Sequence, residues 1–306
     1  MQAAYRTMSD GASVAVYTWL PEQPPKAVLH IVHGMAEHAS RYDDFAKTAC
    51  KRGFAVVASD HRGHGKTGTK SGLMGYLADG DGFGRVVDDQ KEINAEIRKR
   101  YPALPVVIVG HSFGSFVTQE YIERYGATVQ AAVLIGSAGP NPSVFLASLL
   151  ANFNCAFKGR KSAAKFMNTL VFGSYNNRIK NPHTAFDWLS RDEKEVKKYI
   201  DDEYCGFVCT AGFFQDFMRG LKRLHTQEAL KSIPVELPVL ITAGSADPVS
   251  NGGKTLKTLY RMYQNIGMQD VTLKLYENAR HEILNETNKE EVKADILSWI
   301  EKRSLS

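Results

Sequence analysis

The stretch Val107-Ile108-Val109-Gly110-His111-Ser112-Phe113-Gly114-Ser115 decides how the rest of the chain is interpreted. A short apolar run ends in the pattern G-x-S-x-G, and a stretch of helical character follows it. In this pattern the serine occupies a tight strand-to-helix turn with its hydroxyl exposed. Gly110 and Gly114 leave room for backbones that a Cβ would block. Ser112 is therefore a candidate nucleophile, and the alternative from this stretch alone is a structural turn.

Apolar runs on both sides of this stretch alternate with helical patterns. Such alternation predicts an α/β fold, with a mostly parallel sheet covered by helices on both faces. An Asp10-Gly11 turn between two extended stretches predicts an additional hairpin at the N-terminus. The predicted strands of the first part are Ala27 to Val32, Phe54 to Ser59, Val106 to Val109 and Ala131 to Ser137, and the predicted helices are Ser40 to Arg52, Val86 to Tyr101 and Ser112 to Tyr125.

This alternation stops between Gly139 and Pro234, where the sequence predicts helices and no strand. Apolar residues recur at helical spacing over Ser143 to Phe153 and over Thr210 to Leu224. Ser190-Arg191-Asp192-Glu193 matches a capping box that opens a helix to about Ile200. Strands return at Val239 to Ala243 and Val271 to Tyr276, and helices are expected over Gly253 to Met262 and Val292 to Ile300. We therefore divide the chain into a core of residues 1–138 and 235–306 and an inserted helical cap of residues 139–234.

The Gly-rich segment Asp60 to Gly84 is predicted to be an irregular loop. Gly63-His64-Gly65-Lys66-Thr67-Gly68 matches G-x-G-x-x-G in form. A dinucleotide site also requires a helix that starts at this loop, so that its N–H groups face the pyrophosphate. Because Thr69 to Gly75 has no amphipathic period, we predict no such site.

Composition and charge narrow the function classes. The chain has 306 residues, a net charge of +5, 43% hydrophobic and 23% charged residues, and no basic block of the length that suggests a nucleic-acid partner. Four cysteines lack the spacing of a zinc site or of a disulfide framework, which favours reduced thiols and a cytoplasmic location. No signal peptide and no transmembrane run is predicted, since no apolar stretch approaches 18 residues.

A serine nucleophile needs a base and a group that orients the base. Asp247 follows the strand Val239 to Ala243, and His281 follows the strand Val271 to Tyr276. The order Ser, Asp, His is the one found in α/β hydrolases, and parallel strands end at one edge of the sheet. We therefore expect Ser112, Asp247 and His281 to form a catalytic triad. Weaker candidates for the acid, because none directly follows a strand, are Asp202, Asp216 and Asp270.

An oxyanion hole should accompany the triad. One N–H donor is expected from Phe113, the residue after the nucleophile. The second should come from the loop that follows the first parallel strand, where His33-Gly34-Met35 stands. We expect the backbone N–H of Met35 to be this donor; the alternative is a simple glycine turn.

The sequence resembles the family of monoglyceride lipases and related bacterial lysophospholipases. The segment His33 to Tyr42 is similar to its H-G-x-x-E-H-x-x-R-Y signature, and Ser59 to Gly65 is similar to its D-x-x-G-H-G loop. Gly110 to Gly114 matches a further block of the family, but continues with Ser115 where animal monoglyceride lipases have glycine. The remaining matches are Gly244 to Asp247, Ala279 to Glu282, Asp187 to Asp192 and Cys205 to Phe207. The resemblance implies the same triad and oxyanion donors, and it implies that Glu37 and Arg41 shape the polar end of the site.

Together these features predict an ester hydrolase that needs no metal or other cofactor. The apolar cap and the resemblance favour a monoacylglycerol or a lysophospholipid as substrate. We expect Phe145, Leu149 and Phe214 to line an acyl tunnel or a membrane-facing lid, or else to pack the cap onto the core. A transient contact between the cap and a membrane surface is possible on this interpretation. The alternatives are a short-chain or aryl-ester esterase or an acyltransferase with the same triad, and a ligand-binding protein without catalysis; the oligomeric state is not predicted.

Overall fold

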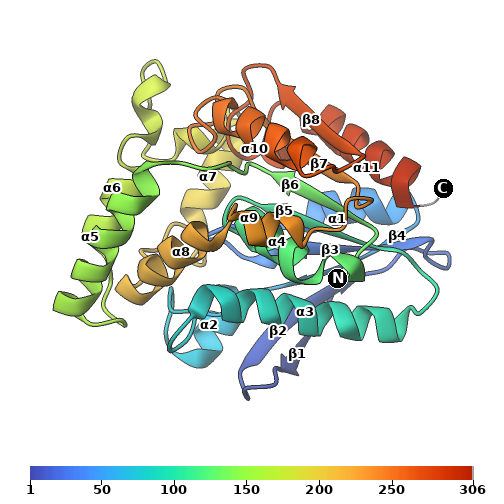
Figure 1. Cartoon of the computed structure of the whole chain (residues 1–306), viewed down its shortest axis with the longest axis horizontal. Coiled ribbons are helices and arrows are strands. Elements are labelled where there is room, and N and C mark those ends of the chain that lie inside the picture. The colour runs from blue at the N-terminus through green and yellow to red at the C-terminus, as the bar shows by residue number, and fades with distance from the viewer. Residues whose placement is uncertain (305–306) are drawn as a thin grey trace.

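A computed structural model describes residues 1–304 of the chain. Its centre is one eight-stranded sheet with the order β1-β2-β4-β3-β5-β6-β7-β8 (Figure 1). The N-terminal strands β1 and β2 pair antiparallel, β2 pairs antiparallel with β4, and the remaining neighbours are parallel. The strands are β1 (Gln2–Thr7), β2 (Ser13–Trp19), β3 (Ala27–Val32), β4 (Phe54–Ser59), β5 (Val106–His111), β6 (Ala131–Ile135), β7 (Val239–Gly244) and β8 (Val271–Tyr276). The predicted α/β fold is confirmed.

Helices cover both faces of the sheet because its central strands are apolar on both sides. Every residue of β3, β4, β5, β6 and β7 is buried, which is the pattern of strands enclosed between helical layers. On one face, α1 (Asp43–Lys51) and α11 (Lys289–Ser304) pack with one set of strand residues into a single core cluster. On the other face lie α3 (Gly82–Arg100), α4 (Phe113–Tyr125) and α10 (Lys254–Asn265).

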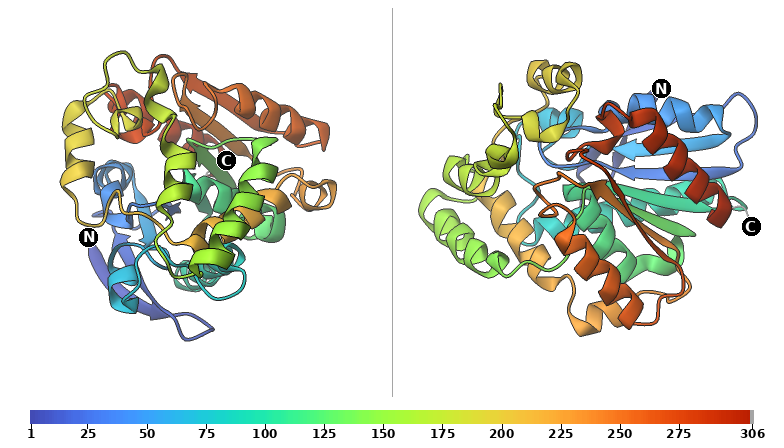
Figure 2. Two further views of the ribbon diagram at one scale, coloured as in Figure 1. Left: turned by 90° about the vertical axis from the view of Figure 1, so that its left-hand side faces the viewer. Right: turned by 90° about the horizontal axis from the view of Figure 1, so that it is seen from above.

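The cap is inserted between β6 and β7 and projects from the sheet edge where these strands end (Figures 1 and 2). Within residues 136–238 the only strand-like pairing is an isolated bridge between Ala163 and Thr210. The domain boundaries that we predicted fall in the connections beside β6 and β7. The cap helices are α5 (Ser143–Lys158), α6 (Lys165–Phe172), α7 (Glu193–Asp201), α8 (Ala211–Arg223) and α9 (Gln227–Lys231), with 3₁₀ turns at Tyr175–Arg178 and Asp187–Leu189.

The expectation of an irregular loop over Asp60 to Gly84 is wrong in two places. A short helix, α2 (Gly65–Ser71), starts at the Gly-rich segment, and α3 starts at Gly82 rather than at Val86. The N-terminus of α2 is already occupied by an internal carboxylate, because Asp60 Oδ2 accepts from the N–H of Lys66 at 2.8 Å. This bond, rather than the absence of a helix, argues against a phosphate there.

The predicted capping box at Ser190 is also wrong. The helix α7 begins two residues later than the motif implies, and its N-cap is Asp192, whose carboxylate accepts from the N–H of Lys194. The Ser190 hydroxyl accepts from the N–H of Asp192 at 2.9 Å and donates to the carbonyl of Asn285 at 2.8 Å. Its side chain therefore links the turn before α7 to the segment that contains Asn285. Across residues 1–304, no helix combines the length and apolarity needed to cross a bilayer.

Candidate active site

Ser112 lies at the corner between β5 and α4 in a strained conformation. Its φ of 52° and ψ of −120° belong to a region that non-glycine residues rarely adopt. The two flanking glycines make this corner possible. A Cβ on Gly114 would meet the carbonyl oxygen of Val32 at 2.0 Å, and one on Gly110 would meet Thr118 Oγ1 at 2.2 Å. The close approach of α4 to β3 therefore holds the serine at the carboxyl edge of the sheet.

Asp247 and His281 meet at the same edge, as their positions after β7 and β8 predict. His281 Nδ1 lies 3.0 Å from Asp247 Oδ1, and both side chains are almost fully buried. The N–H of Val249 also donates to this carboxylate oxygen at 2.9 Å and fixes its orientation. An aspartate in this position holds the imidazole in one tautomer and leaves Nε2 to act as a base.

Ser112 and His281 line one cavity of about 320 Å³. Met35 and Phe113, the two residues expected to form the oxyanion hole, line it as well. Its polar lining includes Glu37, His111, Tyr175, Tyr199 and Glu282. Most of its apolar lining belongs to the cap, from Val171, Phe172, Phe186, Trp188, Leu189, Phe207 and Phe217. The cavity thus has polar groups from both the core and the cap, and an apolar wall that comes mostly from the cap.

The loop that carries Met35 is held from within. The N–H of Gly34 donates to Glu37 Oε1 at 2.5 Å. The His33 ring accepts from the N–H of His61 through Nε2, so its proton resides on Nδ1, which donates to the Gly34 carbonyl at 2.7 Å. Burial lowers the pKa of His33 well below its usual value and that of His61 to about 3, so both rings are neutral supports. These contacts fix the backbone next to the expected oxyanion donor.

A cluster that we call the buried network joins the loops around Ser112; its members are Glu37, Arg41, Glu282 and His111. Arg41 donates to Glu37 at 2.6 Å and to both carboxylate oxygens of Glu282 at 2.7 and 2.8 Å. His111 Nδ1 lies 3.2 Å from Glu37 Oε1, which also accepts from the Tyr42 hydroxyl at 2.8 Å. The network therefore connects the oxyanion loop, the residue before Ser112 and the residue after His281.

The charges of the buried network hold each other ionised. Burial alone would raise the pKa of Glu37, but the hydrogen bond from His111 and the charge of Arg41 bring it well below its usual value. The pKa of Glu282 is likewise lowered against burial by Arg41. Burial would lower the pKa of His111, yet the hydrogen bond to Glu37 raises it.

The backbone of the cap contacts the loop that carries the candidate base. The N–H of His281 donates to the carbonyl of Trp188 at 3.3 Å, and that of Glu282 donates to Leu189 at 2.7 Å. The Arg280 side chain donates to the carbonyls of Asp187 and Ser190. These bonds make the segment Asp187 to Ser190 part of the wall behind the candidate base.

Four of the predicted substrate-binding residues lie outside the cavity. Phe145 and Leu149 are 63% and 50% exposed on the outer side of α5, whereas Phe214 is fully buried in the core cluster. None of the three lines the cavity, so the prediction of an acyl tunnel formed by them is wrong. Arg41 lies behind Glu37, bound to two carboxylates, and it too does not line the cavity. Only Glu37 of this group does.

Sequence reasoning missed most of the cap residues that line the cavity. Trp188 and Leu189, as well as Phe207, lie in segments that carry the family resemblance, which was the available signal. His111 and Glu282 are neighbours of the predicted nucleophile and base, and their position in the chain was a second signal. Phe172 and Phe186 had no sequence signal, because nothing in their spacing shows which way they point.

The three weaker candidates for the acid are bound elsewhere. Asp202 bonds to His38 at 2.9 Å, and Asp216 pairs with Arg160 at 2.7 Å. Asp270 pairs with Arg303 at 2.6 Å. None of them lines the cavity that contains Ser112.

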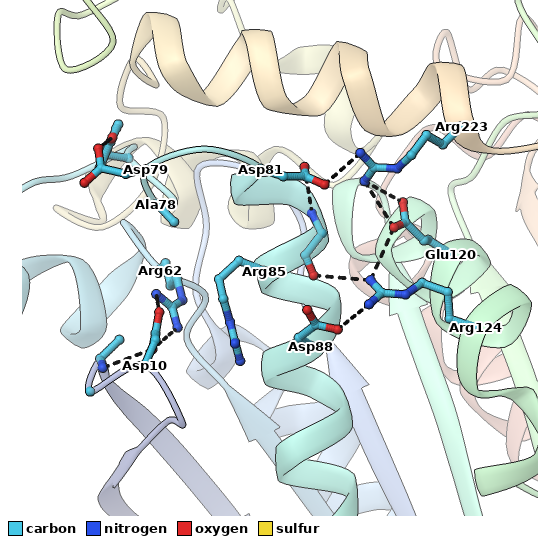
Figure 3. Close-up of a pocket in the computed structure, with 14 residues that line it drawn as sticks. Asp10, Arg62, Ala78, Asp79, Asp81, Arg85, Asp88, Glu120, Arg124 and Arg223 are labelled. Atoms are coloured by element: carbon cyan, nitrogen blue, oxygen red, sulfur yellow. Dashed lines mark hydrogen bonds and ion pairs between the residues drawn. The ribbon is translucent and has the colours of Figure 1, made fainter.

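A larger hollow of about 950 Å³ opens elsewhere between the turn that joins β1 to β2 and the helices α3, α4 and α8, and we call it the charged hollow (Figure 3). Its arginines are already paired with acids from the same walls. Arg62 binds Asp10 at 2.7 Å, Arg124 binds Asp88 at 2.5 Å and Arg223 binds Glu120 at 3.1 Å. Because its cations are neutralised and no candidate nucleophile faces it, size alone does not make it the active site.

Comparison with known proteins places this geometry in a family. Residues 23–288 match the family model described as serine aminopeptidase, S33. The chain belongs to this family. It is 30% identical to the monoglyceride lipase of Mus musculus over 96% of this chain and 89% of that protein, and 29% identical to the monoacylglycerol lipase of Mycolicibacterium smegmatis over 95% and 93%.

A solved structure agrees with the family assignment. The thermostable carboxyl esterase from Bacillus coagulans, crystallised with glycerol, superposes with a TM-score of 0.92 and 27% identity, covering 99% of this chain and 98% of that one. The predicted family resemblance is confirmed, and the chain is a hydrolase of the α/β-hydrolase type.

Proposed function

We propose that the chain is a serine carboxylic-ester hydrolase that releases a fatty acid from a single-chain lipid ester, either a monoacylglycerol or a lysophospholipid. The observation that carries this proposal is the cavity of about 320 Å³, which Ser112 lines together with polar groups and an apolar wall that comes mostly from the cap. A single acyl chain fits against such a wall, while its ester carbonyl reaches the serine. The names of the relatives, monoglyceride lipase and monoacylglycerol lipase, support the same substrate class.

The reaction proceeds through an acyl-enzyme. Neutral His281 takes the proton of the Ser112 hydroxyl through Nε2 as Oγ attacks the ester carbonyl. The N–H groups of Met35 and Phe113 donate to the oxyanion of the tetrahedral intermediate. The imidazolium, stabilised by Asp247, then protonates the leaving alcohol. Water attacks the acyl-enzyme with the same assistance, which releases the fatty acid and restores Ser112.

Substitution of the serine tests the chemistry. Ser112→Ala should lower ester hydrolysis by about 10⁴-fold or more, because the nucleophile is removed while the oxyanion donors remain. A serine-directed fluorophosphonate should label the wild type and the control Ser143→Ala, and it should not label Ser112→Ala. Labelling that is unchanged in Ser112→Ala would exclude this residue as the nucleophile.

A chain-length series tests the substrate class. Fatty acid release from monoacylglycerols and lysophospholipids should exceed release from esters with acyl chains of fewer than about four carbons, because longer chains bury more apolar area against the cap. A clear preference for the short esters would replace the lipid assignment by that of a short-chain esterase. Transfer of the acyl group to an added alcohol, rather than to water, would instead identify an acyltransferase.

The cap also carries a surface suited to an anionic membrane. Its helices α5 and α6 expose a group of large apolar side chains: Phe145, Leu146, Leu149, Phe153, Phe157, Phe166 and Leu170. Residues 139–186 contain no Asp or Glu and six basic residues: Lys158, Arg160, Lys161, Lys165, Arg178 and Lys180. Exposed aromatic residues bordered by cations bind the interface of anionic bilayers. We infer that this surface contacts the membrane in which a lipid ester is dissolved.

Vesicle sedimentation tests this contact. The chain should bind phosphatidylglycerol vesicles more tightly than phosphatidylcholine vesicles, and high salt should weaken that binding. The double substitution Phe153→Ser and Phe157→Ser should reduce binding, whereas Leu20→Ser, which changes an exposed apolar residue of the core, should not. Equal binding to both vesicle types, or no effect of the cap substitutions, would exclude this surface as the contact.

A further inference from the structure

The cap and the oxyanion loop meet at a point that the proposed ester hydrolysis leaves unexplained. The Tyr199 hydroxyl and the N–H of Gly206, both in the cap, donate to the carbonyl of Ala36 at 2.9 and 3.0 Å. Ala36 itself has a φ of 52°, which a non-glycine residue rarely adopts. We call this contact between residues 36–40 and 199–206 the cap–loop junction.

Three side chains with metal-binding atoms converge at the cap–loop junction. His38 comes from the oxyanion loop, and Asp202 and Cys205 come from the cap segment after α7. One ligand atom from each lies within 4.8 Å of the other two. Ligand atoms on one tetrahedral zinc ion are about 3–4 Å apart, so side-chain adjustments of about 1 Å close the site.

Two of these side chains, His38 and Asp202, already have the supporting contact that a metal ligand needs. His38 Nδ1 lies 2.8 Å from the Ser40 hydroxyl, which can donate to it or accept from it. Asp202 Oδ1 accepts from the N–H of Tyr204 at 2.8 Å, and this leaves Oδ2 toward His38. In this arrangement Nε2 donates to Asp202 Oδ2 at 2.9 Å. The other tautomer, with the proton on Nδ1 and donated to Ser40, frees the lone pair of Nε2 for a cation.

We propose that the cap–loop junction is a binding site for a divalent zinc-class cation, held by His38, Asp202 and Cys205. An imidazole nitrogen, a carboxylate oxygen and a thiolate together favour Zn²⁺ over Mg²⁺ or Ca²⁺, which prefer oxygen ligands alone. Three protein ligands leave the fourth tetrahedral position to water. Binding releases the thiol proton of Cys205 to solvent, so the ion with one thiolate and one carboxylate is electrically neutral.

The charges around the junction allow a cation there. Burial raises the pKa of the Cys205 thiol, and the charge of Arg41, which acts in the opposite direction, is already shared with Glu37 and Glu282. Cys205 and Asp202 are both partly exposed, which gives an ion a path from solvent. The site is separate from the triad. Because its ligands come from both the oxyanion loop and the cap, a bound ion would link these two segments.

Cobalt is the probe for this site because a thiolate bound to Co²⁺ gives a charge-transfer band in the near ultraviolet. Titration of the full chain, without an affinity tag, should produce this band and saturate at a single equivalent of Co²⁺, and added Zn²⁺ should remove it. Cys205→Ser should lose the band. The matched control Cys50→Ser, which changes the other partly exposed cysteine, should retain it.

The remaining ligands are tested by affinity. Asp202→Asn and His38→Gln should each weaken Co²⁺ binding by more than about tenfold, with the thermal midpoint measured alongside to establish that both variants fold. Absence of the band in the wild type, or a band that persists in Cys205→Ser, would overturn the site. This readout does not depend on ester hydrolysis, so it separates failure of the metal site from failure of the proposed function.

Discussion

The buried network beside Ser112 and the charged hollow are both built from arginines paired with acids, yet they differ in what surrounds them. Arg41 and its partners Glu37 and Glu282 have side chains no more than 10% exposed. In the charged hollow, Arg223 is 37% exposed and Asp81 is 41% exposed. The smaller cavity lies next to the enclosed pairs, and the larger one is lined by pairs in which at least one partner is solvated. Volume and charge alone therefore do not locate a site; the position of buried charges relative to a candidate nucleophile is more informative.

The largest effect is expected where the two carboxylates of the buried network lose the arginine that they share. Arg41→Met leaves Glu37 and Glu282 buried with only His111 nearby to offset their charges, and should lower the free energy of unfolding by about 3–5 kcal/mol. Urea denaturation at pH 7 measures this change. A loss below about 1 kcal/mol would mean that the network behaves as a surface ion pair does, and the contrast with the charged hollow would not hold.

A smaller effect is expected when the network keeps its shape but loses one charge. Glu37→Gln weakens the bonds that place Gly34 and His111, so the oxyanion loop shifts and kcat for ester hydrolysis should fall by up to about 10²-fold, with KM nearly unchanged. Glu120→Gln makes the same change in the charged hollow and should leave kcat unaltered. Equal losses in both variants would point to general destabilisation instead of positioning.

The contributions of the two regions to the free energy of unfolding should change with pH in opposite directions. The folded-state pKa values of Glu37 and Glu282 are lowered, because Arg41 and His111 outweigh burial. Their stabilisation is therefore present above the usual glutamate pKa and is lost as the pH falls through the folded values. The pKa of Glu120 is raised by burial against the charge of Arg223. Its contribution is present at low pH and is lost as the pH rises through its raised folded value.

Denaturation midpoints between pH 7 and pH 3 test this opposition. Glu37→Gln should reduce the loss of stability that accompanies a fall in pH. Glu120→Gln should reduce the loss of stability that accompanies a rise in pH. The same pH profile in both variants would contradict the assignment of opposite shifts.

The smallest effect is expected in the charged hollow itself. Arg223→Gln removes a partly solvated cation that is shared by Asp81 and Glu120, and the expected loss is about 0–1 kcal/mol. Thermal denaturation in low and high salt measures it, and the difference from wild type should shrink as salt screens the pair. A loss as large as that of Arg41→Met would show that the charged hollow is also a structural centre.

The residues of the site that lie at the ends of strands could be predicted from the sequence. Ser112, Asp247 and His281 each follow an apolar strand, and parallel strands bring such positions to one edge by local rules. The role of the glycines around Ser112 could be predicted for the same reason, because the need for a residue without a Cβ follows from the tight turn itself.

The cap could be predicted as helical but not in its orientation. The apolar residues of α5 and α8 recur with the same helical spacing, yet Phe145 is exposed and Phe214 is buried. Periodicity identifies an apolar face and does not identify what covers it. The buried network was missed for a related reason. Arg41 and Glu282 are 241 residues apart in the chain, and only the folded sheet brings them together.

The backbone bonds between cap and core have a consequence for how such enzymes diversify. Trp188 and Leu189 of the cap accept from the loop of the candidate base, and Tyr199 and Gly206 hold the carbonyl of Ala36 beside the oxyanion donor. A cap exchanged between relatives would therefore bring with it part of the catalytic framework. Substrate range and turnover would be inherited together, and a chimaera should join its parts outside Asp187 to Gly206 and carry the matching Ala36 loop.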